Sequence, residues 1–68
     1  MEIFSLRLKE QRKSAGITQS QMADKLGIRQ QSYARYENNN GEPNLDTVVK
    51  IAAILDVSVD YLLGLSDF

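Results

Sequence analysis

The chain has 68 residues, 43% of them hydrophobic and 25% charged, a net charge of −1 at pH 7, and neither cysteine nor histidine. This length suffices for one domain with one small core, so we predict that residues 1–68 form a single domain. Without Cys and His the chain can form no disulfide and no ordinary zinc site, and it lacks the commonest nucleophile–base pairs, so we expect no metal, no cofactor and no enzymatic activity.

The positions of glycines and capping residues along the chain predict a series of short helices. The first helix covers about residues 2–15 and ends at Gly16, a residue suited to a left-handed C-cap. The apolar residues near one of its faces are Phe4, Leu8 and Ala15. The second helix begins after Thr18, and Gln21 stands three residues later, at the spacing of a capping box. Gly27 ends this helix, whose apolar side consists of Met22, Ala23 and Leu26.

The third helix covers about residues 30–38 and is followed by an Asn- and Gly-containing loop. Pro43 in this loop prevents the helix from continuing. Asn44 is the expected N-cap of the fourth helix, residues 45–55. The apolar stripe of this helix consists of Leu45, Val48, Val49, Ala52 and Leu55, widened by Ile51 and Ile54. We therefore expect the fourth helix to be the central one, covered on most sides.

The last predicted helix covers residues 59–63, between a Ser58 N-cap and Gly64. No segment shows the alternation typical of strands. The predicted fold class is all-α, a compact domain of five helices.

One face of the third helix has an unusual composition. Plotted at 100° per residue, an arc of about 140° contains the amides and one guanidinium, with an alanine in its middle. The members of this arc are Gln30, Ala34, Asn38, Gln31 and Arg35. Tyr33 and Tyr36 lie on the opposite side, so we predict that the tyrosines pack against the core while the amides are exposed.

This amide face suits the major groove of DNA. Gln can form two hydrogen bonds with adenine, and Arg with guanine. Ala34 lets the helix approach closely and offers a methyl group to thymine. We therefore expect Gln30, Gln31 and Arg35 to contact base edges. The alternative is an ordinary solvated face.

The charges are divided unevenly along the chain. Residues 7–35 contain seven basic and two acidic residues, a net charge of +5, whereas the rest of the chain carries −6. A polarised field of this kind can orient a protein on a polyanion. The alternative is a chance division in a small chain.

Hydropathy indicates no membrane segment and no signal peptide. The longest apolar run, Ile51–Leu55, is far shorter than a bilayer span. Charges from Glu2 onward leave no apolar core of signal-peptide length. We expect a cytoplasmic protein with no membrane partner and no evident small-molecule site.

The segment TQSQMADKLGIRQQSYARYENN, residues 18–39, resembles the helix-turn-helix family of phage repressors and Cro proteins, also called the Cro-type or xenobiotic-response-element family. The resemblance extends to LKEQRKSAGITQ before this segment and to PNLDTVVKIAAILDVSVDYLLG after it. It implies a repressor-like DNA-binding domain with the helix-turn-helix in helices two and three. The implied function is that of a sequence-specific regulator of transcription, a repressor that binds double-stranded DNA. The alternative is a protein-interaction module of the same fold, such as an antitoxin or an anti-repressor partner.

The resemblance also implies roles for individual residues. Helix three would be the recognition helix, and the residues matching base-contacting or groove-facing positions are Gln30, Gln31, Ser32 and Arg35. Gln19 matches a glutamine that binds phosphate and can brace the amide of Gln30. The residues expected to contact phosphate or the DNA backbone are Thr18, Gln19, Arg29, Asn38 and Asn40.

Two positions depart from the family pattern. Arg29 stands where Ser or Thr usually caps helix three, so it reaches either phosphate or a base edge. Glu42 replaces a common Lys or Arg and should lower non-specific affinity.

Arg12 and Glu37 match a pair that joins helix one to the end of helix three. The residues alone support the same pairing, because a carboxylate is unfavourable at a helix C-terminus and beside phosphates unless it has a partner. Arg12 would then be structural. The alternative for Glu37 is an exposed surface carboxylate.

One recognition helix covers only a few base pairs, so we expect a homodimer on a two-fold operator. The predicted dimer surface lies at the C-terminal end and comprises Val59, Tyr61, Leu65 and Phe68. For Leu65 and Phe68, packing of the tail on its own domain is an equal alternative.

Overall fold

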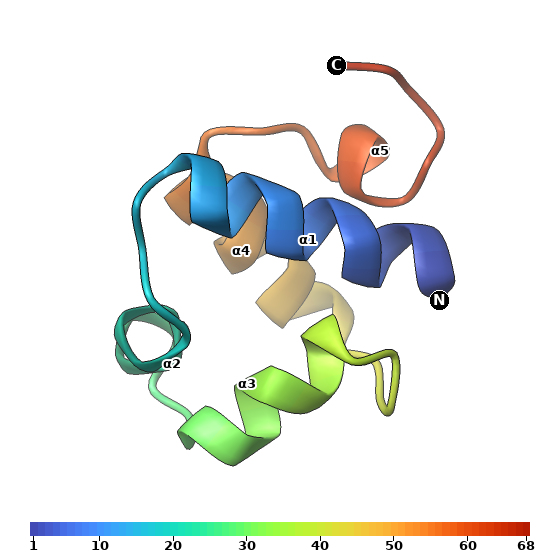
Figure 1. The fold of residues 1–68 in the computed structure, drawn as a ribbon. Coiled ribbons are helices and arrows are strands. Elements are labelled where there is room, and N and C mark those ends of the chain that lie inside the picture. Colours follow the sequence, from blue (N-terminus) through green and yellow to red (C-terminus); the bar gives the residue numbers. More distant parts are fainter.

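The computed structural model describes all 68 residues as five α-helices without a strand, as predicted (Figure 1). The helices are α1 (Glu2–Ser14), α2 (Gln19–Leu26), α3 (Gln30–Glu37), α4 (Leu45–Leu55) and α5 (Val59–Leu62). The predicted bounds of α4 are confirmed at both ends. Helices α1, α3 and α5 each end one residue earlier than predicted, because Ala15, Asn38 and Leu63 are C-cap residues.

Side chains cap three of the five helix N-termini. Thr18 and Gln21 form the predicted capping box, with Gln21 N–H donating to Thr18 Oγ1 at 3.0 Å and Thr18 N–H donating to Gln21 Oε1 at 2.9 Å. Asn44 caps α4 and Ser58 caps α5 in the predicted manner. The N-cap of α3 is Arg29, whose side chain makes no capping hydrogen bond. The first backbone hydrogen bond of α3 runs from Tyr33 N–H to the carbonyl oxygen of Arg29 at 3.0 Å.

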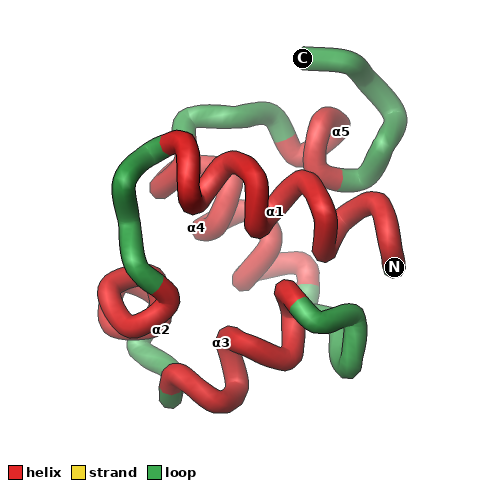
Figure 2. Tube along the Cα trace, viewed as in Figure 1, coloured by secondary structure: helices red, strands yellow, loops and turns green.

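Helix α1 lies between α3 and α5 in Figure 1, and α4 lies behind it. Helix α2 contacts both α3 and α4. Figure 2 shows the short link of residues 27–29 that joins α2 to α3 and the longer loop of residues 38–44 that follows α3. Gly27 makes the sharp turn after α2 possible, because its φ of 69° lies in the left-handed region.

All five helices contribute to one hydrophobic core. Its eleven buried residues are Phe4, Leu8, Met22, Ala23, Leu26, Tyr33, Val48, Ile51, Ala52, Leu55 and Leu62. Tyr33 is fully buried although it lies on the helix with the amide face. The core therefore holds α3 by its tyrosine side and leaves the other side free.

The predicted apolar stripe of α4 is wrong in part. Leu45 is 79% exposed and Val49 is 58% exposed, so α4 is not covered on most sides. Its buried residues are Val48, Ile51, Ala52 and Leu55, at the i, i+3, i+4, i+7 spacing of one face. Leu45 and Val49 lie on the flank beside this face, and both are largely exposed. Ala15, predicted on the apolar face of α1, is likewise exposed.

Candidate nucleic-acid interface

Helix α3 has two distinct sides, as predicted. Gln30, Gln31, Ser32 and Arg35 are exposed, and Ala34 is partly exposed. Tyr33 is buried and Tyr36 is half-buried on the other side, with their rings edge to face at a centroid distance of 6.2 Å. Two aromatic anchors thus fix the rotation of α3 about its own axis. The amide side is presented to solvent in one orientation.

The amide side is also hollowed. Gln30, Gln31 and Ala34 line a shallow, open depression on the outer surface of α3. The small side chain of Ala34 leaves this space beside the two amides. A base edge approaching the helix would meet amide donors and acceptors around a methyl group.

The predicted partners Arg12 and Glu37 lie together between α1 and α3. Arg12 Nε donates to Glu37 Oε2 at 2.5 Å and Arg12 Nη2 donates to Oε1 at 3.0 Å, while both side chains are almost fully buried. The same guanidinium donates from Nη1 to the carbonyl oxygen of Ile17 at 2.7 Å. Arg12 therefore faces the interior and is unavailable to DNA.

Glu37 accepts two further hydrogen bonds besides those from Arg12. The hydroxyl of Tyr33 donates to Oε2, and Gln19 Nε2 donates to Oε1 at 3.2 Å. Burial acts to raise the pKa of Glu37, but the hydrogen bonds from Arg12, Tyr33 and Gln19 outweigh it and hold this pKa below its usual range. Burial, reinforced by the bond to Glu37, raises the pKa of Tyr33, and the bond to Glu37 raises that of Arg12. One carboxylate thus joins α1, α2 and α3.

The predicted contact between Gln19 and Gln30 is absent. The side-chain nitrogen of Gln19 donates to Glu37, and no hydrogen bond connects Gln19 with Gln30. A carboxylate is a stronger acceptor than a neutral amide. In this structure the Gln19 amide therefore donates to Glu37, and its contact with phosphate stays a prediction.

The other residues predicted to contact the DNA backbone lie at the start of α2, at the two ends of α3 and in the loop after α3. Thr18, Arg29, Asn38 and Asn40 are all exposed. Thr18 stands at the start of α2 and Arg29 at the start of α3, whereas Asn38 and Asn40 follow α3. Thr18, Arg29 and Asn40 therefore lie outside the amide arc, whereas Asn38 belongs to the arc and is the C-cap residue of α3.

Arg35 does not extend straight outward from α3. Its NH2 group donates to the carbonyl oxygen of Asn40 at 3.2 Å, so the guanidinium lies over the following loop near Gly41. Sequence reasoning did not predict this contact. This bond uses one of the five N–H donors of the guanidinium.

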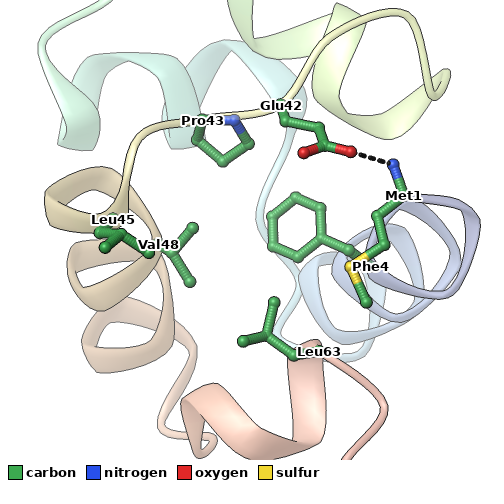
Figure 3. A pocket seen from close by; sticks show the side chains of 7 residues that line it. All are labelled: Met1, Phe4, Glu42, Pro43, Leu45, Val48 and Leu63. Carbon is green, nitrogen blue, oxygen red and sulfur yellow. Dashed lines mark hydrogen bonds and ion pairs between the residues drawn. The ribbon is translucent and has the colours of Figure 1, made fainter.

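A second hollow lies beside that loop (Figure 3). It is lined by Met1, Phe4, Glu42, Pro43, Leu45, Val48 and Leu63. The Met1 ammonium donates to Glu42 Oε1 and to Asn39 Oδ1, each at 2.8 Å. The carboxylate of Glu42, predicted to weaken non-specific DNA affinity, thus already faces a positive charge. No sequence pattern indicated this ion pair.

The basic character of residues 7–35 is smaller at the surface than in the sequence. Arg12 is buried in its ion pair, and Arg7 donates to backbone carbonyls of α5 and of the C-terminal segment. The remaining basic residues of this region are exposed, namely Lys9, Lys13, Lys25, Arg29 and Arg35. The predicted polarity therefore persists in reduced form.

The residues predicted for a dimer surface divide into two pairs. Val59 and Tyr61 are partly buried and pack against the core. Leu65 is 75% exposed and Phe68 is 91% exposed. Only the second pair offers a large apolar area to solvent.

None of the helices has the length and apolar character needed to cross a bilayer.

A short helix, a turn at a left-handed glycine and a second helix with a free outer face define a helix-turn-helix domain. Residues 8–62 match the family model described as "Helix-turn-helix". This chain therefore belongs to the helix-turn-helix family, and its resemblance to phage-type repressors of that family is confirmed by the relatives below.

Two relatives illustrate the match. The HTH-type transcriptional regulator YobD of Bacillus subtilis is 45% identical over 65 residues, which make up 96% of this chain and 58% of that protein. The CTXphi phage transcriptional repressor RstR of Vibrio cholerae is 48% identical over 58 residues, which make up 85% of this chain and 52% of that protein. The chain thus spans less than two thirds of the length of either relative.

Solved structures of SinR have the same fold. One of them is a crystal structure of SinR, the master regulator for biofilm formation, in complex with DNA. It superimposes with a TM-score of 0.80 at 34% identity and covers 88% of this chain and 97% of that one. A complex of SinR with the SinI protein matches with a TM-score of 0.81 and covers 59% of that chain.

Proposed function

We propose that this chain is a sequence-specific, double-stranded DNA-binding regulator of transcription that acts as a repressor. The observation that carries the proposal is the outer face of α3, where exposed amides surround a depression at Ala34 while two tyrosines anchor the helix behind it. The major groove of B-form DNA admits an α-helix. The family and the DNA complex of SinR support the same function.

In this proposal α3 lies in the major groove and its exposed side chains contact base edges. These side chains are Gln30, Gln31, Ser32 and Arg35. Residues at the start of α2, at the ends of α3 and in the loop after α3 contact phosphates and fix the position of the domain on the duplex. They are Thr18, Gln19, Arg29, Asn38 and Asn40. Binding at an operator blocks polymerase, so the protein needs no chemistry, and it acts in the cytoplasm.

We further propose that two copies bind one two-fold operator. One α3 contacts too few base pairs to select a single locus, whereas a dimer doubles the contacted sequence. Leu65 and Phe68 supply exposed apolar area at the C-terminal end. In Figure 1 this end lies on the other side of α1 from α3, so association there leaves both amide faces free.

A second candidate is a protein-interaction module of the same fold. Exposed Leu45 and Val49 on α4 favour it, because large apolar residues on one helix flank are a common feature of protein contacts. The SinR–SinI complex is a protein complex of a similar chain. In this alternative the partner contacts α4 or α5 and α3 stays unbound.

Selection of bound duplexes from a random pool separates the two candidates. A regulator returns an enriched two-fold sequence, and its affinity falls with salt with a log–log slope of about −5 if six phosphates are contacted. Failure to shift any duplex, or a flat salt response, would favour the interaction module.

A further inference from the structure

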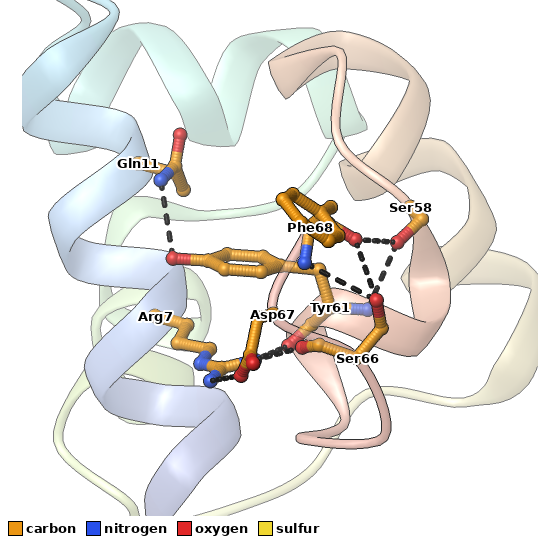
Figure 4. A network of polar contacts seen from close by, with 7 residues as sticks. All are labelled: Arg7, Gln11, Ser58, Tyr61, Ser66, Asp67 and Phe68. Carbon is orange, nitrogen blue, oxygen red and sulfur yellow. Dashed lines mark hydrogen bonds and ion pairs between the residues drawn. The ribbon is translucent and has the colours of Figure 1, made fainter.

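Arg35 is an exposed arginine that the fold nevertheless holds in place. Its Nη2 atom donates to the main-chain carbonyl oxygen of Asn40 at 3.2 Å, and its other four N–H donors have no partner in the protein. Arg7 also donates to main-chain carbonyls, but only 19% of its side chain is exposed and its bonds are directed into the fold (Figure 4). Arg35 is therefore oriented by the chain and still free to bind a base edge.

The main chain joins the same two residues in the opposite direction. The N–H group of Asn40 donates to the carbonyl oxygen of Arg35 at 2.9 Å. The next residue, Gly41, lies beside the guanidinium, because a Cβ atom at this position would be 3.8 Å from Arg35 Nη2 and 3.9 Å from Nε. The loop after α3 thus runs back along the last turn of the helix and contacts the Arg35 side chain.

Asn39 is the residue at which the chain turns back. It follows Asn38, the C-cap residue of α3, and its φ of 58° lies in the left-handed region. A left-handed residue at this position brings the next N–H group back to the helix, here from Asn40 to Arg35, as in a Schellman motif. Asparagine and glycine adopt this conformation readily, whereas a β-branched residue there is strained.

We infer that Asn39 is a positioning residue for base recognition: its left-handed backbone places the carbonyl group of Asn40 so that it holds the guanidinium of Arg35 ready for a base edge. The inference rests on the proposed function, in which α3 lies in the major groove. A guanidinium that is already held loses less conformational entropy on binding than a mobile one does. Asn39 thus strengthens the preference for one base pair without contacting that base pair itself.

The test measures affinity for every single base-pair change in the selected half-site. Arg35→Ala identifies the base pair that Arg35 contacts, because the preference at that position is lost. Asn39→Val disfavours the left-handed conformation and Asn39→Gly retains it. Both Asn39 variants lose the hydrogen bond that the Met1 ammonium donates to Asn39 Oδ1, so the backbone conformation is what separates them.

A matched control perturbs the same backbone conformation at another helix end. Asp56, the C-cap residue of α4, is the other non-glycine residue in the left-handed region, with a φ of 55°. Asp56→Val therefore introduces the same local strain without changing the loop after α3. Circular dichroism confirms that each variant is folded at the assay temperature, and Asn39→Ala replaces Asn39→Val if the latter does not fold.

We expect Asn39→Val to lower the preference at the Arg35 base pair by about three- to tenfold and to change the preferences elsewhere by less than about twofold. Asn39→Gly should retain the wild-type profile, and so should Asp56→Val. An unchanged profile in Asn39→Val, an equal loss at all base pairs, or the same loss in either Asn39→Gly or Asp56→Val would overturn the inference.

The same profiles distinguish this inference from the proposed function. Uniform weakening by Arg35→Ala would show that Arg35 selects no base and would overturn the role of Asn39, while preferences at the other base pairs would leave the proposed function standing. A wild-type protein without any base preference would contradict the proposed function itself.

Discussion

Arg12 in α1 and Glu37 at the end of α3 form a buried, two-pronged ion pair, with N–O distances of 2.5 Å and 3.0 Å. Gln19 of α2 donates to the same carboxylate. The two helices of the helix-turn-helix are therefore joined to α1 through one charged group. The link between α2 and α3 consists of only three residues and fixes the start of α3. The Glu37 carboxylate fixes the position of the other end of α3.

Removing one member of the pair should be costly. Arg12→Ala leaves the Glu37 carboxylate buried without its cationic partner, so we expect a loss of about 3–5 kcal/mol in the free energy of unfolding. For a domain of this size that loss lowers the melting temperature by more than about 10 °C. Thermal denaturation followed by circular dichroism measures the change.

A double-mutant cycle separates the pair from the general effect of each substitution. Arg12→Met with Glu37→Gln removes both charges but keeps an acceptor for the Tyr33 hydroxyl. We expect the double variant to lose less stability than the sum of the two single variants, by about 1–3 kcal/mol. Additive losses would show that the two side chains do not stabilise each other.

The low pKa of Glu37 predicts a dependence of stability on acid. In the folded state Glu37 stays ionised below the usual glutamate pKa of about 4.3, whereas the unfolded chain takes up the proton there. The contribution of Glu37 is therefore complete above that pH and is lost as the pH falls through the folded pKa. Urea denaturation between pH 6 and pH 2 should show a shallower acid slope for Glu37→Gln than for the wild type. A slope that is unchanged by this substitution would contradict the assignment.

Two adjacent valines in α4 provide a matched test of the core. Val48 is 5% exposed, whereas Val49 is 58% exposed. Val48→Ala should lower the free energy of unfolding by about 1.5–3 kcal/mol, because it removes two buried methyl groups. Val49→Ala should change it by less than about 0.5 kcal/mol, since alanine also favours the helix. Equal losses of unfolding free energy in chemical denaturation would instead indicate that Val49 belongs to the buried stripe, as the sequence predicted.

The parts of the molecule that could be predicted from the sequence depend on local rules. The capping box of Thr18 with Gln21 and the tyrosine side of α3 follow from spacing alone, and the structure contains both. The burial of α4 was misjudged because helical spacing defines a stripe but not how much of it the neighbouring helices cover. The preference of Gln19 for Glu37 could not be predicted, since it depends on how three helices meet.

Contacts between distant segments could not be predicted from the sequence for the same reason. The bonds of Arg7 to the backbone of Tyr61 and Ser66 join positions more than fifty residues apart and involve carbonyl groups that every residue has. Arg35 was expected to point into a groove, but a carbonyl in the next loop lies within its reach. A sequence shows which side chains can donate, whereas the fold determines which acceptors are near.

The proposed contact of the amide face of α3 with base edges is tested most directly by a profile of base preferences. The affinity of the wild type and of Gln31→Ala is measured for every single base-pair change in the selected half-site. We predict that Gln31→Ala loses the preference at one base pair, worth about 1–3 kcal/mol, and keeps the preferences at the others. Uniform weakening at all positions, or a profile identical to that of the wild type, would contradict the claim.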